Sequence, residues 1–251
     1  GYGHREVTLK KALDVGAIDK SFTDLRESVV GADLVVICTP AAKVVDVLDG
    51  IRDRCAPNAV ITDVASTKTD ICRHACETWP RPCRFVGSHP MAGSEKHGPE
   101  NADPELYGGS VVLVETGEHL DPEARACVCA MWRALDAAVV NVTPEAHDAA
   151  VARTSHLPHI LASCMAVVAA RDCDVEPFVG QGFRDFTRIA ASRPEIWRDI
   201  CLTNRDGIVP CLDELTEELQ RVRAAILEGN GETVEEVFRS GNEARRKALG
   251  E

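Results

Sequence analysis

Apolar runs rich in β-branched residues alternate with amphipathic segments along the first 142 residues of the chain. Each run contains apolar residues at consecutive positions, which is typical of strands buried on both faces, and helical patterns of about 12 to 15 residues separate the first three runs. The runs lie at 32–40, 58–66, 83–90, 108–115 and 137–143. This pattern predicts βαβ units in an α/β fold with a doubly wound parallel sheet, and we expect the last two strands to extend the same sheet.

The pattern changes at Thr143, where Thr at an N-cap and Pro144 at the first helical position indicate a helix start. No strand pattern follows, so the sequence predicts helices from there to the end of the chain. We therefore expect two domains, a Rossmann-like nucleotide-binding domain at 1–142 and an all-α domain at 143–251.

The first predicted helix of the second domain covers 144–171 and is interrupted at Pro158, which cannot donate a backbone hydrogen bond. Its second half, ILASCMAVVAA, is apolar on every side and needs to be covered all round. About a hundred residues of helix rarely cover such a segment alone. The sequence thus predicts a homodimer, formed through the helical domain, in which the partner chain provides the cover.

Composition narrows the classes of partner. The net charge of the 251-residue chain is −12 and basic residues form no run, so a nucleic-acid interface is not expected. No apolar run reaches the roughly 20 residues of a membrane span and no signal peptide is apparent, so we expect a cytoplasmic protein without a membrane partner. The eleven cysteines, among them Cys38 and Cys164 in apolar runs, predict mostly small buried side chains in a reducing compartment. Cys72 and Cys76 lie on successive helical turns, so no metal site is expected.

Open parallel sheets bind ligands beyond the carboxyl ends of their strands, which here are 38–40, 63–66 and 87–90. The third end opens the stretch GSHPMAGSEKHG, which gathers two histidines, two hydroxyls, an acid and a base between glycines. The sequence predicts a ligand site at this edge of the sheet.

The chain contains no G-x-G-x-x-G motif, although a dinucleotide site normally carries one after its first strand. The opening GYGHRE fits the end of a second strand, so we expect the first strand and its Gly-rich loop upstream of Gly1, unless the cofactor is held abnormally. Gly3 stands where an NAD-specific acid is expected, and the following His4 and Arg5 favour NADP or dual use. Arg5 fits equally well as a solvated charge at a helix start.

Five motifs in this order carry a family resemblance: VVICTP, DVASTK, GSHPMAGSEKHGPENADPELYGG, TSHLPH and GFRDFTRIAASRPEIWRDI. The chain resembles prephenate dehydrogenases, which include the arogenate and cyclohexadienyl dehydrogenases of tyrosine biosynthesis, over essentially its whole length. The resemblance implies a Rossmann domain, a helical dimerisation domain, and oxidative decarboxylation of prephenate or arogenate with NAD or NADP as cofactor.

The resemblance also implies roles for individual residues. His89 matches the family base that takes the substrate hydroxyl proton, Ser66 matches its hydrogen-bonding partner, and Glu95 matches a glutamate that helps to fix the histidine's protonation. Substrate-binding positions are matched by Arg188, which pairs with the ring carboxylate, and by His159, Gln181, Asp185 and Trp197. The expected cofactor-binding residues are Gly3, His4, Arg5, Thr39, Pro40 and Ser66.

From the residues themselves we expect Asp185 to pair with Arg188 across one helical turn and to orient it. His156, three residues before His159, is expected to be structural.

Two other functions stay open at this point. Hydroxyacid- or imine-reducing NADP enzymes share a Rossmann sheet and a helical tail, but typically place a catalytic lysine or acid where this chain has TSHLPH. A non-catalytic ligand-binding dimer would explain the missing glycine motif but not the combination of His89, Ser66 and Arg188. The sequence does not decide between prephenate and arogenate, or between NAD and NADP.

Overall fold

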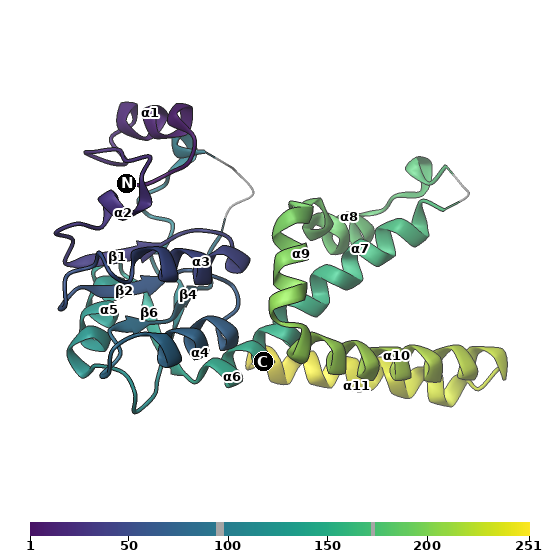
Figure 1. Ribbon diagram of the computed structural model, residues 1–251. Helices are drawn as coiled ribbons and strands as arrows, with labels where there is room; N and C mark the ends of the chain where they lie inside the picture. Colours follow the sequence, from purple (N-terminus) through teal and green to yellow (C-terminus); the bar gives the residue numbers. More distant parts are fainter. Residues whose placement is uncertain (94–97, 172–173) are drawn as a thin grey trace. The chain divides into compact units, whose positions relative to one another are not determined.

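The strands of the protein form two three-stranded sheets in the computed structural model, which describes residues 1–93, 98–171 and 174–251 (Figure 1). The first sheet is fully parallel, with order β1-β2-β3, and the second has order β4-β5-β6. The bounds are β1 (Leu34–Ile37), β2 (Val60–Asp63), β3 (Phe85–Val86), β4 (Ser88–Pro90), β5 (Val111–Glu115) and β6 (Ala138–Val142).

One continuous segment connects the two sheets, because only Gly87 separates β3 from β4. The expectation that the last two strands extend one parallel sheet is therefore modified: β5 pairs antiparallel with β4, and β6 pairs parallel with β5. Parallel neighbours need a crossover connection. The helix α5 (Pro122–Ala134) provides it between β5 and β6, whereas the described part of the β4–β5 connection contains only the short 3₁₀ helix η1 (Pro99–Asn101).

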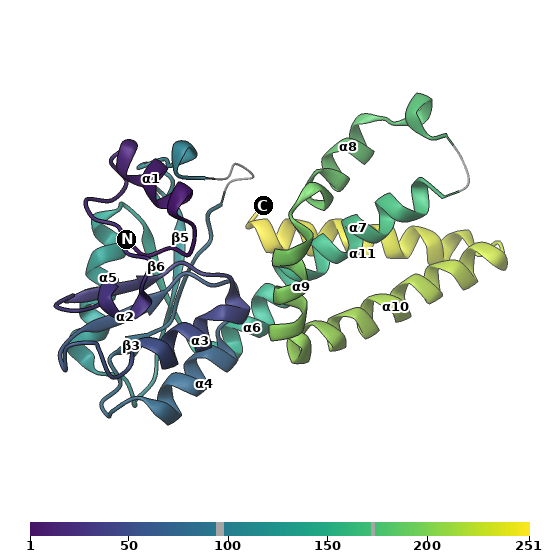
Figure 2. The same cartoon turned by 45° about the horizontal axis from the view of Figure 1, so that its top comes forward.

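Helices cover both faces of the strands, as a doubly wound architecture requires (Figures 1 and 2). Successive side chains of β2 point to opposite faces of the sheet, since side chains alternate along a strand. Ile61 packs in a core with α3 (Ala41–Ile51) and α4 (Thr69–Thr78), while Val60 packs in a second core with α5. The expectation of buried strands is thus confirmed for β2 and β3, whereas β1 and β6 are mostly partly buried or exposed.

Two short helices precede these layers, α1 (Glu6–Asp14) and α2 (Leu25–Ser28). After β6 the chain is helical, as predicted. The helix expected at 144–171 is interrupted close to Pro158: a π-helical turn η2 (Ala152–His156) separates α6 (Pro144–Val151) from α7 (Leu157–Ala169). The remaining elements of this unit, which ends at Arg205, are η3 (Glu176–Phe178), α8 (Gln181–Thr187), η4 (Arg188–Ala191) and α9 (Pro194–Thr203).

The second compact unit, Asp206–Glu251, is a hairpin of α10 (Arg205–Leu227) and α11 (Gly231–Leu249). Gly229, with φ +68°, allows the sharp turn, and the Asn230 side chain accepts a hydrogen bond from Thr233 N to cap α11. An ion pair of 2.9 Å between Arg221 Nη2 and Glu236 Oε2 joins the two helices. This division at 205/206 follows compactness, and a domain boundary at 142/143 stays a prediction.

The ten described cysteines form no disulfide. The expectation of buried side chains is wrong for Cys38 and Cys164, which are exposed. Among the described residues, no helix is both long and apolar enough to span a membrane.

Candidate active site

Three predicted site residues follow the ends of the three parallel strands: Thr39 follows β1, Ser66 follows β2, and His89 lies three residues beyond β3, within β4. Ser66 and His89 are both partly buried. Within the part of the chain that the structure describes, the Ser66 hydroxyl makes no hydrogen bond. The Thr39 hydroxyl is buried and also lacks a partner there. This edge therefore keeps polar groups available for a ligand.

Two further side chains extend inward from His89. His89 Nδ1 lies 2.8 Å from His147 Nε2, and His147 Nδ1 lies 2.8 Å from Asp148 Oδ1. His147 is fully buried, and Asp148 is 5% exposed. The three residues form a hydrogen-bonded chain from the sheet edge into the interior, which we call the His–His–Asp chain.

Asp148 is fixed by the beginning of α4. The residue before this helix, Lys68, provides no side-chain cap, so the first amides of α4 need an acceptor from elsewhere. Lys68 N donates to Asp148 Oδ1 and Thr69 N donates to Asp148 Oδ2, both at 2.8 Å. Burial raises the pKa of Asp148, but hydrogen bonds from His147, Thr69 and Lys68 outweigh it and leave the pKa below its usual value. Asp148 is therefore an ionised carboxylate.

The electrostatics of His89 favour its neutral form. Burial, reinforced by the nearby His147 and Lys68, lowers the pKa of His89 to about 2. The imidazole is therefore uncharged at neutral pH, and its unprotonated nitrogen can accept a proton.

A buried ion pair supports the strand that carries His89. Lys68 Nζ pairs with the fully buried Asp63, and Asp63 Oδ1 accepts from Ser88 N at 3.1 Å. The Ser88 hydroxyl donates to the Asp63 carbonyl at 2.6 Å and accepts from Trp132 Nε1 at 3.0 Å. Strand β2 and helix α5 thus fix the residue directly before His89.

Asn204 connects the His–His–Asp chain to a group of rings in the helical part. Its Nδ2 donates to the Asp148 carbonyl at 2.8 Å and lies 3.1 Å from His156 Nδ1. His156 is 1% exposed, and burial lowers its pKa to about 4. Its ring lies edge-on to Trp197, with centroids 6.1 Å apart, and Trp197 stacks on His159 at 3.7 Å.

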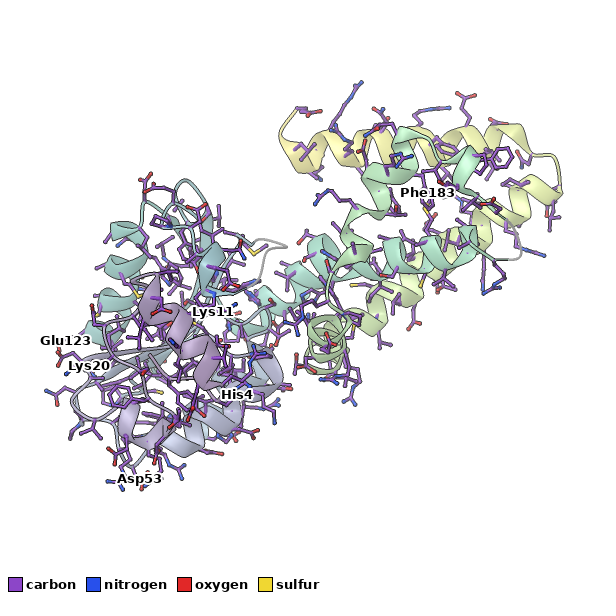
Figure 3. The ribbon with its side chains drawn as sticks, turned by 90° about the horizontal axis from the view of Figure 1, so that it is seen from above. His4, Lys11, Lys20, Asp53, Glu123 and Phe183 are labelled. Atoms are coloured by element: carbon purple, nitrogen blue, oxygen red, sulfur yellow. The ribbon has the colours of Figure 1, made fainter. Side chains whose placement is uncertain are left out.

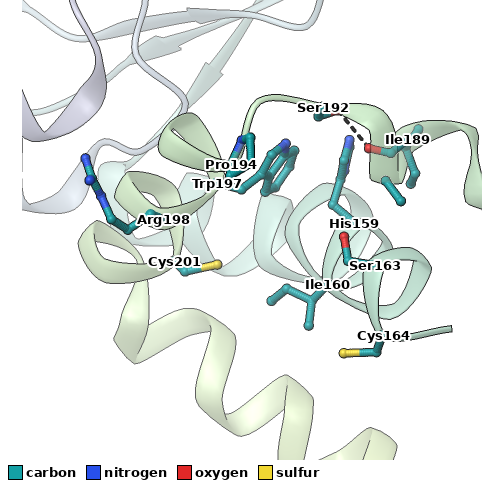
Figure 4. Close-up of a pocket in the computed structure, with 11 residues that line it drawn as sticks. His159, Ile160, Ser163, Cys164, Ile189, Ser192, Pro194, Trp197, Arg198 and Cys201 are labelled. Carbon is teal, nitrogen blue, oxygen red and sulfur yellow. Dashed lines mark hydrogen bonds between the residues drawn. The ribbon is translucent and has the colours of Figure 1, made fainter. Parts of the chain in front are cut away.

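His159 and Trp197 line a cavity of about 410 Å³ (Figure 4). His159 Nδ1 donates to the Ser155 carbonyl at 2.9 Å, which leaves its Nε2 as the second ring nitrogen. Burial lowers the pKa of His159, and the nearby Arg188 contributes in the same direction. Apart from these two rings the walls are mostly apolar, from Ile160, Ser163, Cys164, Ile189, Ala190, Ser192, Pro194, Arg198 and Cys201.

The predicted substrate-binding residues Gln181, Asp185 and Arg188 are exposed. Arg188 begins η4, and within the described residues its guanidinium has no hydrogen-bond or ion-pair partner. The expected pairing of Asp185 with Arg188 is wrong, because Gln181 Nε2 donates to Asp185 Oδ1 at 2.7 Å instead. Gln181 lies one helical turn before Asp185 in α8, whereas Arg188 lies just beyond the end of that helix. The guanidinium is consequently free to meet a ligand.

The expected cofactor residues occupy two places. Thr39 and Pro40 lie between β1 and α3, and Thr39 belongs to the wall of a cavity of about 390 Å³ against β1. At the other place Gly3 lies beside Leu9 of α1, and the exposed His4 and Arg5 precede that helix (Figure 3). Glu95 lies outside the described residues.

Comparisons with known proteins now decide the family. Sequence models described as the nucleotide-binding domain and the dimerization domain of prephenate dehydrogenase match residues 1–141 and 143–240. The chain belongs to the prephenate dehydrogenase family. The expected fold class, a Rossmann-like domain followed by a helical one, is confirmed by the same matches.

Individual relatives in the prephenate dehydrogenase family resemble most of this chain. It is 32% identical to the Bacillus subtilis prephenate dehydrogenase over 93% of its length, but spans 64% of that relative. It is 30% identical to the Zymomonas mobilis cyclohexadienyl dehydrogenase, covering 94% of this chain and 81% of the relative. The solved A. aeolicus prephenate dehydrogenase, in complex with hydroxyphenyl propionate and NAD+, has a TM-score of 0.90 at 27% identity, covering 99% and 88% of the two chains.

In this prephenate dehydrogenase family chain, the sequence reasoning missed His147, Asp148 and Lys68. The usable signal was weak: His147 and Val151 are four residues apart on one side of a predicted helix, which marks a buried side and makes an adjacent His-Asp pair unusual there. The hydrogen bond from Lys68 N to Asp148 joins residues 80 positions apart and leaves no local pattern.

Proposed function

We propose that the protein is an NAD(P)-dependent dehydrogenase that converts prephenate or arogenate by oxidative decarboxylation in tyrosine biosynthesis. The observation that supports this most strongly is the neutral imidazole of His89 at the sheet edge of a prephenate dehydrogenase family chain. In the reaction, hydride leaves ring carbon C4, the C4 hydroxyl passes its proton to a base, the C1 carboxylate leaves as CO2, and the ring oxygen regains a proton as the ring becomes aromatic. Prephenate thus yields 4-hydroxyphenylpyruvate, CO2 and a reduced cofactor, and arogenate yields tyrosine in the same way.

His89 is the general base of this proposal. As hydride departs, positive charge grows at C4 and acidifies its hydroxyl, so a neutral imidazole within hydrogen-bond reach takes the proton. Ser66, whose hydroxyl has no partner within the described residues, is free to hydrogen-bond the substrate hydroxyl. Glu95 is retained as a proposed helper of His89 from its sequence position alone.

The residues at the end of β1 fit a nicotinamide dinucleotide, which would accept the hydride. The Thr39 hydroxyl, just beyond the end of β1, is buried and has no partner among the described residues, so it is available to hydrogen-bond a ligand. Pro40, Ser66 and Gly3 would border the same ligand. We further propose that the exposed His4 and Arg5 favour the 2′-phosphate of NADP, since no acid stands at that point.

The substrate carboxylate is proposed to bind Arg188, whose guanidinium is exposed and unpaired within the described residues. A guanidinium suits bidentate recognition of a carboxylate. His159 and Trp197, stacked at 3.7 Å, would border the ring of the substrate. Gln181 and Asp185 are bonded to each other and would contact its more distant polar groups.

A homodimer through the helical domain completes the proposal. The side chains of Met165, Val167 and Val168 on α7 are 41%, 62% and 64% exposed, an apolar surface that a second copy would cover. The family model that matches residues 143–240 is described as a dimerization domain, which supports the same arrangement.

The test is absorbance of the reduced cofactor with the full-length protein, offering prephenate and arogenate with NAD and NADP in all four combinations. We expect turnover in at least one combination, with one 4-hydroxyphenylpyruvate or tyrosine and one CO2 formed per reduced cofactor. Hydroxyphenyl propionate, which the A. aeolicus relative binds, is expected to compete with the substrate. Absence of turnover in all four combinations from a folded protein would refute the proposed reaction.

A further inference from the structure

The proposed reaction uses His89 but gives no role to the two buried groups behind it. His147 is fully buried, makes hydrogen bonds through both ring nitrogens, and reaches neither the sheet edge nor the cavity beside His159. We propose that His147 and Asp148 are positioning residues that hold the proton of neutral His89 on Nδ1 and so present unprotonated Nε2 as the base. This inference rests on the proposed function only for the role of His89 as base.

The direction of the two hydrogen bonds follows from the carboxylate. Asp148 is ionised and can only accept, so His147 must carry a proton on Nδ1, 2.8 Å from Asp148 Oδ1. In the proposed arrangement His147 Nε2 carries no proton and accepts from His89 Nδ1, also at 2.8 Å. His89 is left with its lone pair on Nε2. The opposite arrangement would place two lone pairs against each other at the Asp148 carboxylate.

The His–His–Asp chain also stabilises the positive charge that forms on His89 during the reaction. When His89 Nε2 takes the substrate proton, the ring becomes a cation whose Nδ1–H already points at His147. Passing that proton to His147 Nε2 would place the positive charge next to the Asp148 carboxylate, with no net gain or loss of protons. The described charged or titratable groups that act on these rings are Asp148, which favours the cation, and Lys68 and His156, which oppose it.

Asp148 is well suited to this role because it cannot rotate freely. Both carboxylate oxygens are held by the first amides of α4, and the Asp148 carbonyl accepts from Asn204. The Lys68 ammonium is paired with Asp63. The position of the acceptor for His147 is therefore determined by the start of α4 and by Asn204.

The direct test is the protonation state of each His89 nitrogen, measured by long-range ¹⁵N–¹H NMR of the ¹⁵N-histidine-labelled full-length protein near pH 8. We expect His89 to carry its proton on Nδ1 in the unsubstituted protein. His147→Phe fills the same space but accepts no hydrogen bond, so the His89 proton is expected to move to Nε2. His147→Gln keeps an amide oxygen near the position of Nε2 and is expected to retain the proton on Nδ1.

Kinetics give a second readout. His147→Phe is expected to lower kcat about 10²-fold with KM changed less than threefold, whereas His147→Gln should recover most of kcat. Asp148→Asn can donate to His147 Nδ1 and invert both rings, so we expect a similar loss. The matched control is His119→Gln, which breaks a histidine–carboxylate pair that is not part of the His–His–Asp chain. In that pair His119 Nε2 lies 3.2 Å from Glu115 Oε1, and kcat should not change in this variant.

The outcomes separate the two proposals. A proton on His89 Nε2 in the unsubstituted protein, or the same His89 tautomer and kcat in His147→Phe, would overturn the inference, whatever the enzyme turns over. The expected tautomers in a protein that turns over neither prephenate nor arogenate would refute the proposed reaction and leave the positioning of His89 intact. If His147→Phe does not fold, the unsubstituted protein and Asp148→Asn still decide the tautomer.

Discussion

The two ends of the proposed site are built in opposite ways. At the sheet edge, His89 is connected through His147 to a carboxylate that is 5% exposed and capped onto a helix. On α8 and η4, Arg188, Gln181 and Asp185 are exposed, and only a bond between Gln181 and Asp185 orders them within the described residues.

This difference reflects what each end must do. A proton acceptor needs a fixed tautomer and a neutral ring, which rigid buried neighbours provide before any ligand arrives. A side chain that binds an anionic substrate must carry a positive charge and be accessible from solvent. It should also be unpaired, so that it does not first have to break an ion pair with a carboxylate of the protein. Experiments that disturb one end should therefore affect turnover or stability, and experiments at the other end should affect substrate affinity.

The largest effect is expected from removing the base. His89→Asn should lower kcat by about 10²- to 10⁴-fold while KM stays within a few-fold, because the base acts on the transition state and not on substrate binding. Steady-state kinetics with the preferred substrate and cofactor test this, with His119→Gln as the control. Unchanged turnover would exclude His89 from the mechanism.

The next largest effect is expected on stability, from the ion pair below the sheet edge. Lys68→Met leaves the buried Asp63 without its cation and should cost about 3 to 5 kcal/mol of unfolding free energy. Chemical denaturation measures this, and Lys43→Met, which breaks the exposed pair with Asp46, should leave the midpoint nearly unchanged. Equal effects of the two variants would contradict the expected difference between a buried and an exposed ion pair.

At the exposed end, Arg188→Gln should raise KM about 10- to 100-fold. This increase corresponds to the loss of a charge-assisted hydrogen bond to the substrate carboxylate, which contributes about 1.5 to 3 kcal/mol to binding. The fold and its unfolding midpoint should not change, since the guanidinium has no partner within the described residues. The matched control is Arg193→Gln, which removes another exposed arginine of the same region, paired with Glu195. A KM that stays the same in Arg188→Gln would place the substrate carboxylate elsewhere.

The smallest effect concerns pH. The pKa of His156 is lowered to about 4 by burial, against about 6.5 in an unfolded chain, so the unfolded state binds more protons between these values. The contribution of neutral His156 to the unfolding free energy is therefore complete above about pH 6.5. It is lost as the pH falls toward 4, and the unfolding free energy decreases by about 1.4 kcal/mol per pH unit in this range. Denaturation at pH 7, 6 and 5 should show a flatter dependence in His156→Gln. Val128→Ala, which destabilises the core without removing a proton site, should keep the original slope.

Much of the architecture could be predicted from local patterns. Each of the five apolar runs contains strand residues, although the run at 83–90 divides into β3 and β4. The Thr143-Pro144 pair marked the start of α6, where the Thr143 side chain accepts from Ala146 N at 3.2 Å. Pro158 indicated the interruption that the structure resolves as a π-helical turn. The antiparallel β4–β5 pair could not be predicted in this way, because strand direction depends on how the connection returns to the sheet.

Local sequence patterns were enough to predict the layers of the nucleotide-binding part, the helical second half and the motifs that place His89, Ser66 and Arg188 near strand and helix ends. These properties depend on the period of apolar residues and on short motifs, which are local. Three features depend on the folded arrangement of the chain: Asp148 caps α4 from 80 residues away, Asp185 bonds Gln181 and not Arg188, and His147 lies behind His89. Hydrogen bonds between distant segments depend on how the layers pack together, and the side chains involved carry no sign of it in their local sequence.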